Sequence, residues 1–568
     1  MIGNILTVPV LLPLLGAATS LVLPRRPRVQ RVVSLACLLG VVATAGYLIY
    51  LTDTGGVIAF WVGGWAAPLG IALVADRLAA LMLLVASVVA LSVLVFATGQ
   101  DEAEVRRETP VSIFHPAFLL LSAGVSNAFL AGDLFNIFVG FEMLLFASYV
   151  LLTLGGSEDR ISAGTTYVVV NLLSSMLFLI TIATIYAATG TVNLAHLALR
   201  LPELSGPVQL LLQLLLLLVF GIKAAIFPLS AWLPDSYPTA PAPVTAVFAG
   251  LLTKVGVYAI IRAQTQIFPH SSVDQLLLVI AALTLLVGIL GAVSQLDIKR
   301  LLSFTLISHI GYLIFGIGMA TSAGYAATIF YVAHHIIVQT TLFLAVGLIE
   351  RHGGTTSLTS LGGMLRAAPV VAVLFFIPML NLGGIPPFSG FIGKLGLFTA
   401  AAELGTPGAY WLMGVGALVS LLTLYALARA WSLAFWRTRA AALGGANAPV
   451  PNTPEGLMLQ GREVALIEHL HDAPDAMPLQ EQRETPALMI AATAGMVAVS
   501  VLLTVAAGPL YAYATRAGER LAAPEQFVAA VLDNPNNVSS GSGKNEIEGY
   551  DPRQSESVAG TKEAGDAS

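Results

Sequence analysis

The sequence predicts an all-α polytopic membrane protein with about 14 transmembrane helices, and three observations support this prediction. Hydrophobic residues make up 57% of the 568 residues and charged residues only 10%, whereas soluble domains carry about 25% charged residues. Apolar stretches of about 20 residues, the length that crosses a bilayer, recur along most of the chain. Two proline-interrupted segments, at Pro228 and Pro387, also resemble each other.

The apolar stretches give the order of the predicted helices. The 14 stretches lie near residues 2–23, 31–51, 78–98, 115–131, 134–154, 164–188, 208–233, 241–265, 274–294, 301–321, 325–349, 369–401, 408–435 and 486–513. The first 13 form a membrane domain over residues 1–435, and the stretch 486–513 is the last transmembrane helix.

Two segments differ from this membrane domain. Residues 440–484 are polar and contain prolines, which predicts a cytoplasmic connection, with a possible surface helix over 457–470. From residue 522 to 568 the chain is rich in Ser, Gly, Asn, Asp and Glu. Such a composition buries too little apolar surface to fold alone, so we expect a disordered tail.

The basic residues predict the orientation, because short cytoplasmic loops are enriched in Lys and Arg. Loops after odd-numbered stretches carry 13 basic residues, whereas loops after even-numbered stretches carry only Arg77, Arg200 and Arg262. The first loop is then cytoplasmic, and both termini lie on the outer face of the plasma membrane.

Composition excludes several classes of function. Cys37 is the only cysteine, so the chain has no Cys-based zinc site or iron–sulfur centre of its own. The net charge of −5 gives no basis for binding nucleic acid. There is neither an HExxH motif nor a phosphate-binding loop. We therefore expect no cofactor, no enzymatic activity of its own and an ion gradient or a partner as the energy source.

The two proline breaks indicate an internal repeat. The five residues Pro228 to Trp232 parallel Pro387 to Phe391, at an offset of 159 residues (387 − 228). The breaks fall in stretches seven and twelve, and an odd separation makes the two copies antiparallel, as in many transporters. Proline leaves nearby carbonyls without a donor, which is tolerated against protein or water. We expect local water at each break; the alternative is a simple packing kink.

Ionisable residues lie inside the apolar stretches, where a charge costs a few kcal/mol. Glu142 lies in the fifth stretch, and Lys223 precedes the first break. We expect Glu142 to modulate Lys223 as its partner; a salt bridge that only fixes helix packing is the alternative.

Lys254 and Lys394 are the other buried lysines. Lys254 has no acidic residue in its own stretch and is a candidate proton-accepting amine, unless it extends to the interface. Lys394 follows the second break, and Glu403 is its alternative structural partner.

Three histidines lie in neighbouring stretches between these lysines. They are His309, His334 and His335. Histidine titrates near pH 6.5 and can relay protons, although a buried histidine is often only a hydrogen-bonded part of the core. Adjacent helical residues point about 100° apart, so we expect only one of His334 and His335 to face the proton path.

Four runs of sequence resemble a known family. They are LFNIFVGFEML, KAAIFPLSAWLPDSYPTAPAPVTAVFAGLLTKVGVYAIIR, LDIKRLLSFTLISHIGY and GGIPPFSGFIGKLGLF. They resemble the antiporter-like subunits shared by Mrp cation/proton antiporters, respiratory complex I and membrane-bound hydrogenases. The resemblance covers roughly residues 70–435 and is strongest to the D-type branch of the Mrp-type Na+/H+ antiporter subunits.

The resemblance implies a fold and a set of functional residues. It implies 14 transmembrane helices with two inverted five-helix repeats, about 115–265 and 274–435, and broken helices 7 and 12. The charged axis of the family maps onto Glu142, Lys223, Lys254, His309, His334 or His335, and Lys394. A lysine at position 394 favours the D-type branch over the central pump subunit of complex I, which typically has glutamate there.

The expected function follows from this resemblance. It implies a proton-translocating subunit of a multi-subunit Na+/H+ antiporter, with protons and Na+ as the transported ions and other subunits of the complex as partners. Two alternatives stay open: a homologous proton-pumping subunit of an NADH:quinone oxidoreductase or membrane-bound hydrogenase, and a structural scaffold that has kept unused charges. The sequence indicates no sodium or metal site in this chain.

Overall fold

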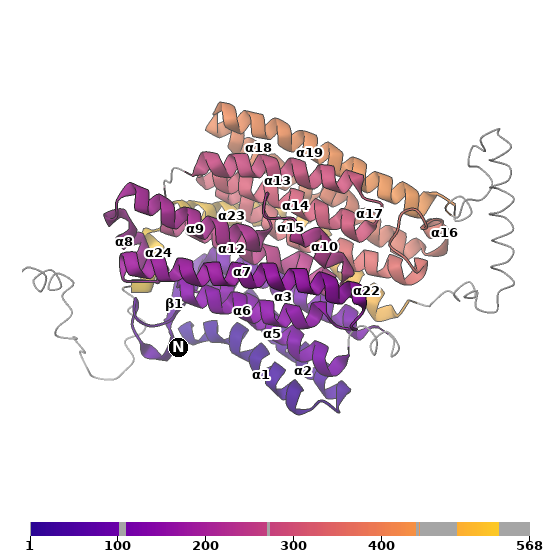
Figure 1. Cartoon of the computed structure of the whole chain (residues 1–568), viewed down its shortest axis with the longest axis horizontal. Helices are drawn as coiled ribbons and strands as arrows, with labels where there is room; N and C mark the ends of the chain where they lie inside the picture. Colours follow the sequence, from indigo (N-terminus) through magenta and orange to yellow (C-terminus); the bar gives the residue numbers. More distant parts are fainter. Residues whose placement is uncertain (1, 101–109, 270–272, 439–441, 443–484, 533–568) are drawn as a thin grey trace, which may run out of the picture. The chain divides into compact units, whose positions relative to one another are not determined.

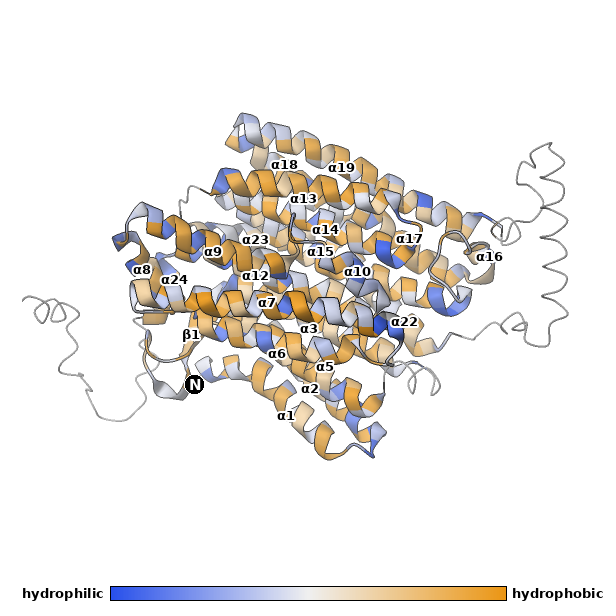
Figure 2. Ribbon diagram, viewed as in Figure 1, coloured by the Kyte–Doolittle hydropathy of each residue, from blue (hydrophilic) through white to orange (hydrophobic). Residues whose placement is uncertain are grey.

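The computed structural model describes residues 2–100, 110–269, 273–438, 442 and 485–532. Within these residues, 13 helices are long and apolar enough to span a membrane by length and composition. They run side by side in Figure 1, and Figure 2 shows them mostly in the hydrophobic colour. The predicted surface helix over 457–470 and the tail beyond residue 532 lie outside the described residues.

The first helices follow the predicted order. They are α1 (Val8–Val22), α2 (Pro27–Gly55), α3 (Arg77–Thr98), α5 (Val111–Leu130), α6 (Leu134–Leu152), α7 (Glu158–Thr189) and α9 (Gly206–Ala224). An antiparallel hairpin of β1 (Ile58–Trp61) and β2 (Ala72–Ala75) connects α2 to α3, and the short α8 (Leu194–Arg200) connects α7 to α9.

The remaining long helices complete the bundle. They are α11–α12 (Ala242–Val247, Thr253–Arg262), α13 (Asp274–Ser294), α14 (Ile298–Gly318), α15 (Ser322–Gly353), α17 (Pro369–Gly383), α18 (Ser389–Leu404), α19 (Pro407–Trp431) and α22 (Ala487–Val505). The short α16 (Met364–Ala367) precedes α17.

Two helices are interrupted where the sequence has Pro228 and Pro387. The helix α9 ends at Ala224, and the chain resumes as the short α10 (Trp232–Ser236); α17 ends at Gly383, and the chain resumes as α18. Each first half ends in a left-handed residue, Ala225 with φ 57° and Gly384 with φ 82°. These two residues are 159 apart (384 − 225), the same offset as the prolines.

Two backbone hydrogen bonds before one helix also recur before another, at a constant offset along the chain. Before α6, the backbone N–H of Leu134 donates to Val192 O, and that of Leu194 donates to Gly132 O. Before α14, the N–H of Ile298 donates to Thr356 O, and that of Leu358 donates to Leu296 O. Every position in the second set lies 164 residues after its counterpart (298 − 134, 356 − 192). The antiparallel orientation of the two units across a membrane stays a prediction.

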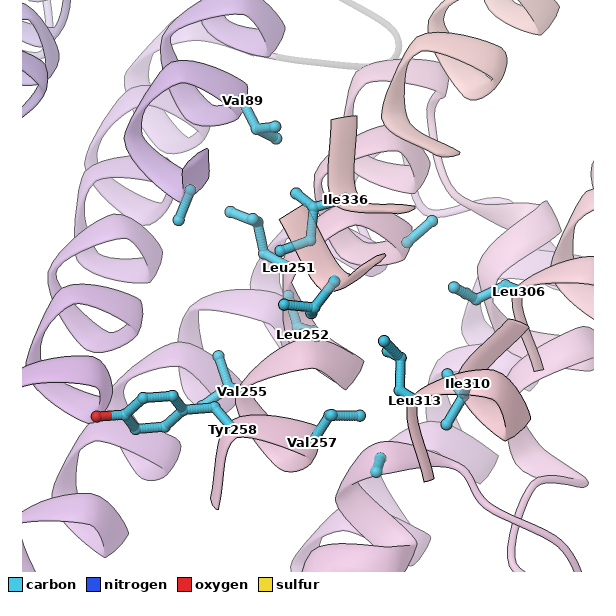
Figure 3. Packing of buried hydrophobic residues seen from close by; sticks show 14 of the residues in the cluster. Val89, Leu251, Leu252, Val255, Val257, Tyr258, Leu306, Ile310, Leu313 and Ile336 are labelled. Atoms are coloured by element: carbon cyan, nitrogen blue, oxygen red, sulfur yellow. The ribbon is translucent and has the colours of Figure 1, made fainter. Parts of the chain in front are cut away.

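The centre of the bundle is formed by the three helices that carry most of the predicted site. The apolar windows of the segments Ala242–Ile267 and Ser322–Gly353 are fully buried, and that of Ile298–Gly318 is 94% buried. Figure 3 shows how Leu252 and Val255 of the first segment lie among Leu313 and Ile336 of the other two. These helices are therefore surrounded by protein, so their polar side chains need partners inside the bundle.

The C-terminal part differs from the sequence prediction in two places. The predicted span 486–513 is two helices, α22 and α23 (Ala507–Ala522), separated at Ala506. Pro509 has no N–H to continue the hydrogen bonds of α22. The predicted disordered tail begins too early, because α24 (Glu525–Leu532) is helical. Its Phe527 and Val531 are buried, and Trp61 Nε1 donates to Val531 O at 3.0 Å.

The left-handed end of α17 gives a prediction on stability. Replacing Gly384 by Ala forces an L side chain into a positive-φ conformation, which costs about 1–2 kcal/mol. A Cβ there would also lie 3.0 Å from Lys394 Nζ. We expect a lower thermal denaturation midpoint for the purified complex that contains Gly384→Ala.

A matched glycine provides the control. Gly414 lies inside α19, and a Cβ there would meet no atom within 4 Å. Because alanine favours a helix interior over glycine, Gly414→Ala should keep or raise the midpoint. A Gly384→Ala complex with an unchanged midpoint would contradict the prediction.

Candidate functional site: a buried line of lysines and histidines

Glu142 and Lys223 lie near each other without forming the salt bridge that was the alternative expectation. Within the described residues, Lys223 Nζ donates to Ser175 Oγ at 3.0 Å and to Asn171 O at 3.5 Å, and it lies 5.5 Å from the centre of the Phe141 ring. Glu142 is close enough to act on Lys223 electrostatically. Its Oε1 is buried, with no hydrogen-bond partner in the described part of the chain. The two groups are neighbours, and helix α7 supplies the direct partners of the amine.

Lys254 is bound by an irregular turn of its own helix. The chain forms a π-helical turn over Phe248–Leu252, immediately before α12. Such turns displace the regular backbone hydrogen bonds and are frequent at functional sites. Lys254 Nζ donates to Ala249 O at 2.6 Å, and the residue is fully buried. The amine is therefore held by a backbone dipole at the centre of the bundle.

The three histidines lie together, joined by Tyr331. His309 Nδ1 lies 2.8 Å from Tyr331 Oη, and the rings of His309 and His335 are stacked with centroids 5.2 Å apart. On the other side, His334 Nδ1 lies 3.0 Å from Ser389 Oγ of α18. Both neighbouring histidines thus contact other members of the group: His335 lies beside His309, and His334 reaches the second break. The sequence prediction was a different one, that only one of them faces the proton path.

Lys394 lies at the second break and reaches back to α17. Its Nζ donates to Ser420 Oγ at 2.9 Å, to Leu382 O at 3.2 Å and to Gly383 O at 3.4 Å. It also lies 5.2 Å from the centre of the Tyr312 ring. The C-terminal carbonyls of a helix carry a partial negative charge, which favours a cation. The alternative partner, Glu403, makes no recorded ion pair with Lys394 among the described residues.

Side chains bind polar groups at both breaks, and the local water expected there stays a prediction. At the first, Trp232 Nε1 donates to Ile222 O at 3.2 Å, and the Phe227 N–H donates to Thr284 Oγ1 at 3.1 Å. At the second, the side chain of Asn381 accepts from Ser389 Oγ and from the Gly390 N–H. Each break is thus tied to a second helix or to its own other half.

The structure adds partners that sequence analysis missed. They are Asn171, Ser175, Tyr331, Asn381, Ser389 and Ser420. Most are small polar residues in apolar stretches, a common pattern that gives little signal alone. Tyr331 was detectable, because it precedes His334 by one helical turn.

Two buried arginines and their ion pairs were also missed, because Arg262 and Arg77 had been assigned to loops. The structure buries both: Arg262 is 2% exposed and Arg77 6%. Arg262 donates two hydrogen bonds of 2.6 Å to Asp76, and Arg77 donates to Asp53 at 2.7 Å. Removing one partner of such a buried pair typically costs about 3–5 kcal/mol.

The contact with Arg262 helps to determine the protonation state of Asp76. Asp76 lies just before α3, where its carboxylate also accepts from the Ala79 N–H. Burial alone would raise the pKa of Asp76, but the Arg262 guanidinium and the backbone N–H bonds together outweigh burial and hold the pKa below its usual value. The carboxylate is therefore ionised in this arrangement.

The site's chemistry is that of proton transfer between nitrogen and oxygen groups. Its amines and imidazoles can each gain or lose a proton, and hydroxyl groups link them. Among the described residues there is no group of three His, Cys, Asp or Glu side chains placed to hold a metal ion. What the arrangement can do is store and pass protons inside an apolar bundle.

Comparisons with known proteins agree with this chemistry. The sequence pattern described as "NADH:quinone oxidoreductase/Mrp antiporter, TM" matches residues 131–423. The D-type subunit of the Na(+)/H(+) antiporter of Alkalihalophilus pseudofirmus is 41% identical over 437 residues, which are 76% of this chain and 87% of that protein.

Two solved structures are similar in fold. A chain in the structure of the Mrp complex from Dietzia sp. DQ12-45-1b has a TM-score of 0.81 and 34% identity, covering 94% of this chain and 100% of that chain. A chain of respiratory complex I from Thermus thermophilus has a TM-score of 0.70, covering 90% of this chain and 99% of that one. Its 23% identity shows the fold alone.

Proposed function

Because the chain belongs to the NADH:quinone oxidoreductase/Mrp antiporter family of membrane subunits, we propose that its buried lysines and histidines carry protons. The chain is a proton-translocating subunit of a multi-subunit Na+/H+ antiporter, a secondary transporter that assembles with other subunits, and not an enzyme. Its 41% identity to a D-type antiporter subunit, against 23% to a complex I chain, favours antiport over a redox-driven pump.

One observation carries the proposed path: titratable and hydroxyl side chains adjoin one another through the centre of the bundle. The line begins near Lys254, which lies within electrostatic range of His335, and the ring of His335 stacks on that of His309. It continues through Tyr331 and His334 to Ser389 at the second break. Such a line inside apolar helices has no structural need, because apolar residues would pack there at lower cost.

Glu142 and Lys223 form a second group, at the first break. The glutamate would act on the lysine through space, while Ser175 holds the amine in the observed position. A movement of Lys223 from Ser175 to Glu142 would change how strongly its proton is held. Inward proton flow along the two groups would then be coupled to Na+ export.

We expect that Lys223→Ala and Glu142→Gln each lower Na+-driven proton flux by about tenfold or more, because a proton-transfer group is lost. The measurement uses inverted vesicles that contain the whole complex, with assembly checked in parallel. Lys299→Ala is the control: Lys299 forms an ion pair with Glu350 at 2.7 Å and should leave flux unchanged. Full flux in both assembled mutants would restrict the Glu142–Lys223 group to a structural role.

The histidine group gives a matched pair of tyrosine variants. Tyr331 and Tyr312 are both buried beside His309, but only the Tyr331 hydroxyl bonds to a histidine; that of Tyr312 donates to Gly416 O. Tyr331→Phe should lower Na+-driven flux several-fold while keeping the ring, whereas Tyr312→Phe should not. Equal flux in the two variants would remove Tyr331 from the path.

We also propose that the chain lies in the plasma membrane with both termini on the outer face, because the first loop is basic. Leu69, in the hairpin between α2 and α3, is 85% exposed, and Arg366 of α16 is exposed as well. A membrane-impermeant maleimide should label Leu69→Cys in intact cells and Arg366→Cys only in inverted vesicles. Cys37, which is 7% exposed, should not be labelled. The reverse labelling pattern would invert the topology.

A further inference from the structure

The Asp76–Arg262 ion pair has no part in the line of residues proposed above. Arg262 lies at the end of α12, in the membrane-spanning segment Ala242–Ile267. Besides its two bonds to Asp76, it donates through Nε to Tyr258 Oη at 2.8 Å. Its guanidinium also lies 4.9 Å from the centre of the Tyr258 ring and 5.6 Å from that of Phe527 in α24. Protein groups therefore enclose this charge.

The pair is connected to Lys254 by the helix itself. Lys254, Tyr258 and Arg262 are spaced by four residues, so they follow one another along one side of α12. The Tyr258 hydroxyl donates to Phe129 O at 2.6 Å and accepts from Arg262. Figure 3 shows the Tyr258 ring pointing away from the other labelled residues of the apolar cluster. A polar edge thus runs from the central lysine to the ion pair.

Cavities lie beyond the pair. Asp76, Gln266 and Phe527 line a small cavity together with Arg77, Arg520 and Gln526. The last three residues also line a second cavity, of about 340 Å³, between α3 and α23. The ion pair therefore lies between this pair of cavities and the polar edge of α12.

The chemistry of the pair makes it a poor carrier of protons. An arginine does not release its proton in proteins. A fixed positive charge in a narrow polar route repels protons and cations. Asp76 has both carboxylate oxygens bonded to Arg262, so it can take up a proton only after that contact breaks. The contact is therefore suited to blocking proton transfer, both by its charge and by the space that it occupies.

From these observations, we propose that the Asp76–Arg262 ion pair is a barrier that separates Lys254 from the cavities beside α23 and α24. It keeps protons from leaking along α12 when no Na+ is exchanged. This inference rests on the proposed function, because a barrier matters only if Lys254 carries protons. The competing explanation is a structural anchor that ties α3 to α12.

The test is the passive proton permeability of vesicles that contain the whole complex, measured without a Na+ gradient. Arg262→Gln removes the charge and keeps hydrogen-bonding groups, so the leak should rise about tenfold, a typical effect of a local charge on the entry of ions. Arg262→Lys keeps the charge and should leak less than Arg262→Gln. Arg516 lines the larger cavity and is a half-exposed partner of Asp53. Arg516→Gln should therefore show the proton permeability of wild type.

Two further variants separate a barrier from an anchor. Should Arg262→Gln not assemble, the double variant Asp76→Asn with Arg262→Gln leaves no unpaired charge and should assemble and leak. Adding Lys254→Ala to a leaking variant should abolish the leak. A leak equal to wild type in assembled Arg262→Gln, or one that persists without Lys254, would overturn the barrier. Full antiport in assembled Lys254→Ala would instead refute the proposed role of Lys254 as a proton carrier, on which this inference rests.

Discussion

The structure depends on one constraint: a polar group inside an apolar bundle must find its partner within the protein, because no bulk water is there to replace it. This constraint explains where the lysines lie. Lys254 binds a carbonyl within a π-helical turn, and Lys394 binds the last carbonyls of a broken helix. In each case an irregular backbone offers an acceptor that a regular helix would have used itself. The irregular backbone therefore supplies the acceptor that each lysine needs, and the lysine supplies the donor that the free carbonyl needs.

The type of partner distinguishes groups that can carry a proton from groups that cannot. None of Lys223, Lys254 and Lys394 has a carboxylate within ion-pair distance among the described residues. Their partners are carbonyls and hydroxyls, which stabilise a charged amine less strongly and leave it free to give up its proton. Arg262 has the opposite environment, with two bonds to Asp76. One bundle thus holds exchangeable and permanent charges, separated by the choice of side chain and partner.

The sequence predicted the helices and the residues of the site better than their contacts. A lysine in an apolar run is visible in the sequence alone, so Lys223, Lys254 and Lys394 could be found without a structure. The pairs Lys223–Ser175 and His334–Ser389 could not, since they join helices 48 and 55 residues apart in the chain. Arg262 was misassigned for a related reason: at the end of a span, an arginine reads as a loop residue until its partner, 186 residues away, is known.

The proposed path contains several buried polar atoms that have no hydrogen-bond partner in the described residues. Both ring nitrogens of His335, Nε2 of His309 and the hydroxyls of Thr253 and Thr340 are buried without a hydrogen-bond partner in the described residues. Each such group costs about 1–3 kcal/mol. Such atoms occur elsewhere in the described bundle as well, among them Glu142 Oε1 and, at the second break, Asn381 Nδ2, so the cost by itself does not single out the path. Around Lys254 a relay would make use of them: a nitrogen with all its bonds permanently satisfied has no place for an incoming proton, and a group that must change partners during transport cannot be fully bonded in every state.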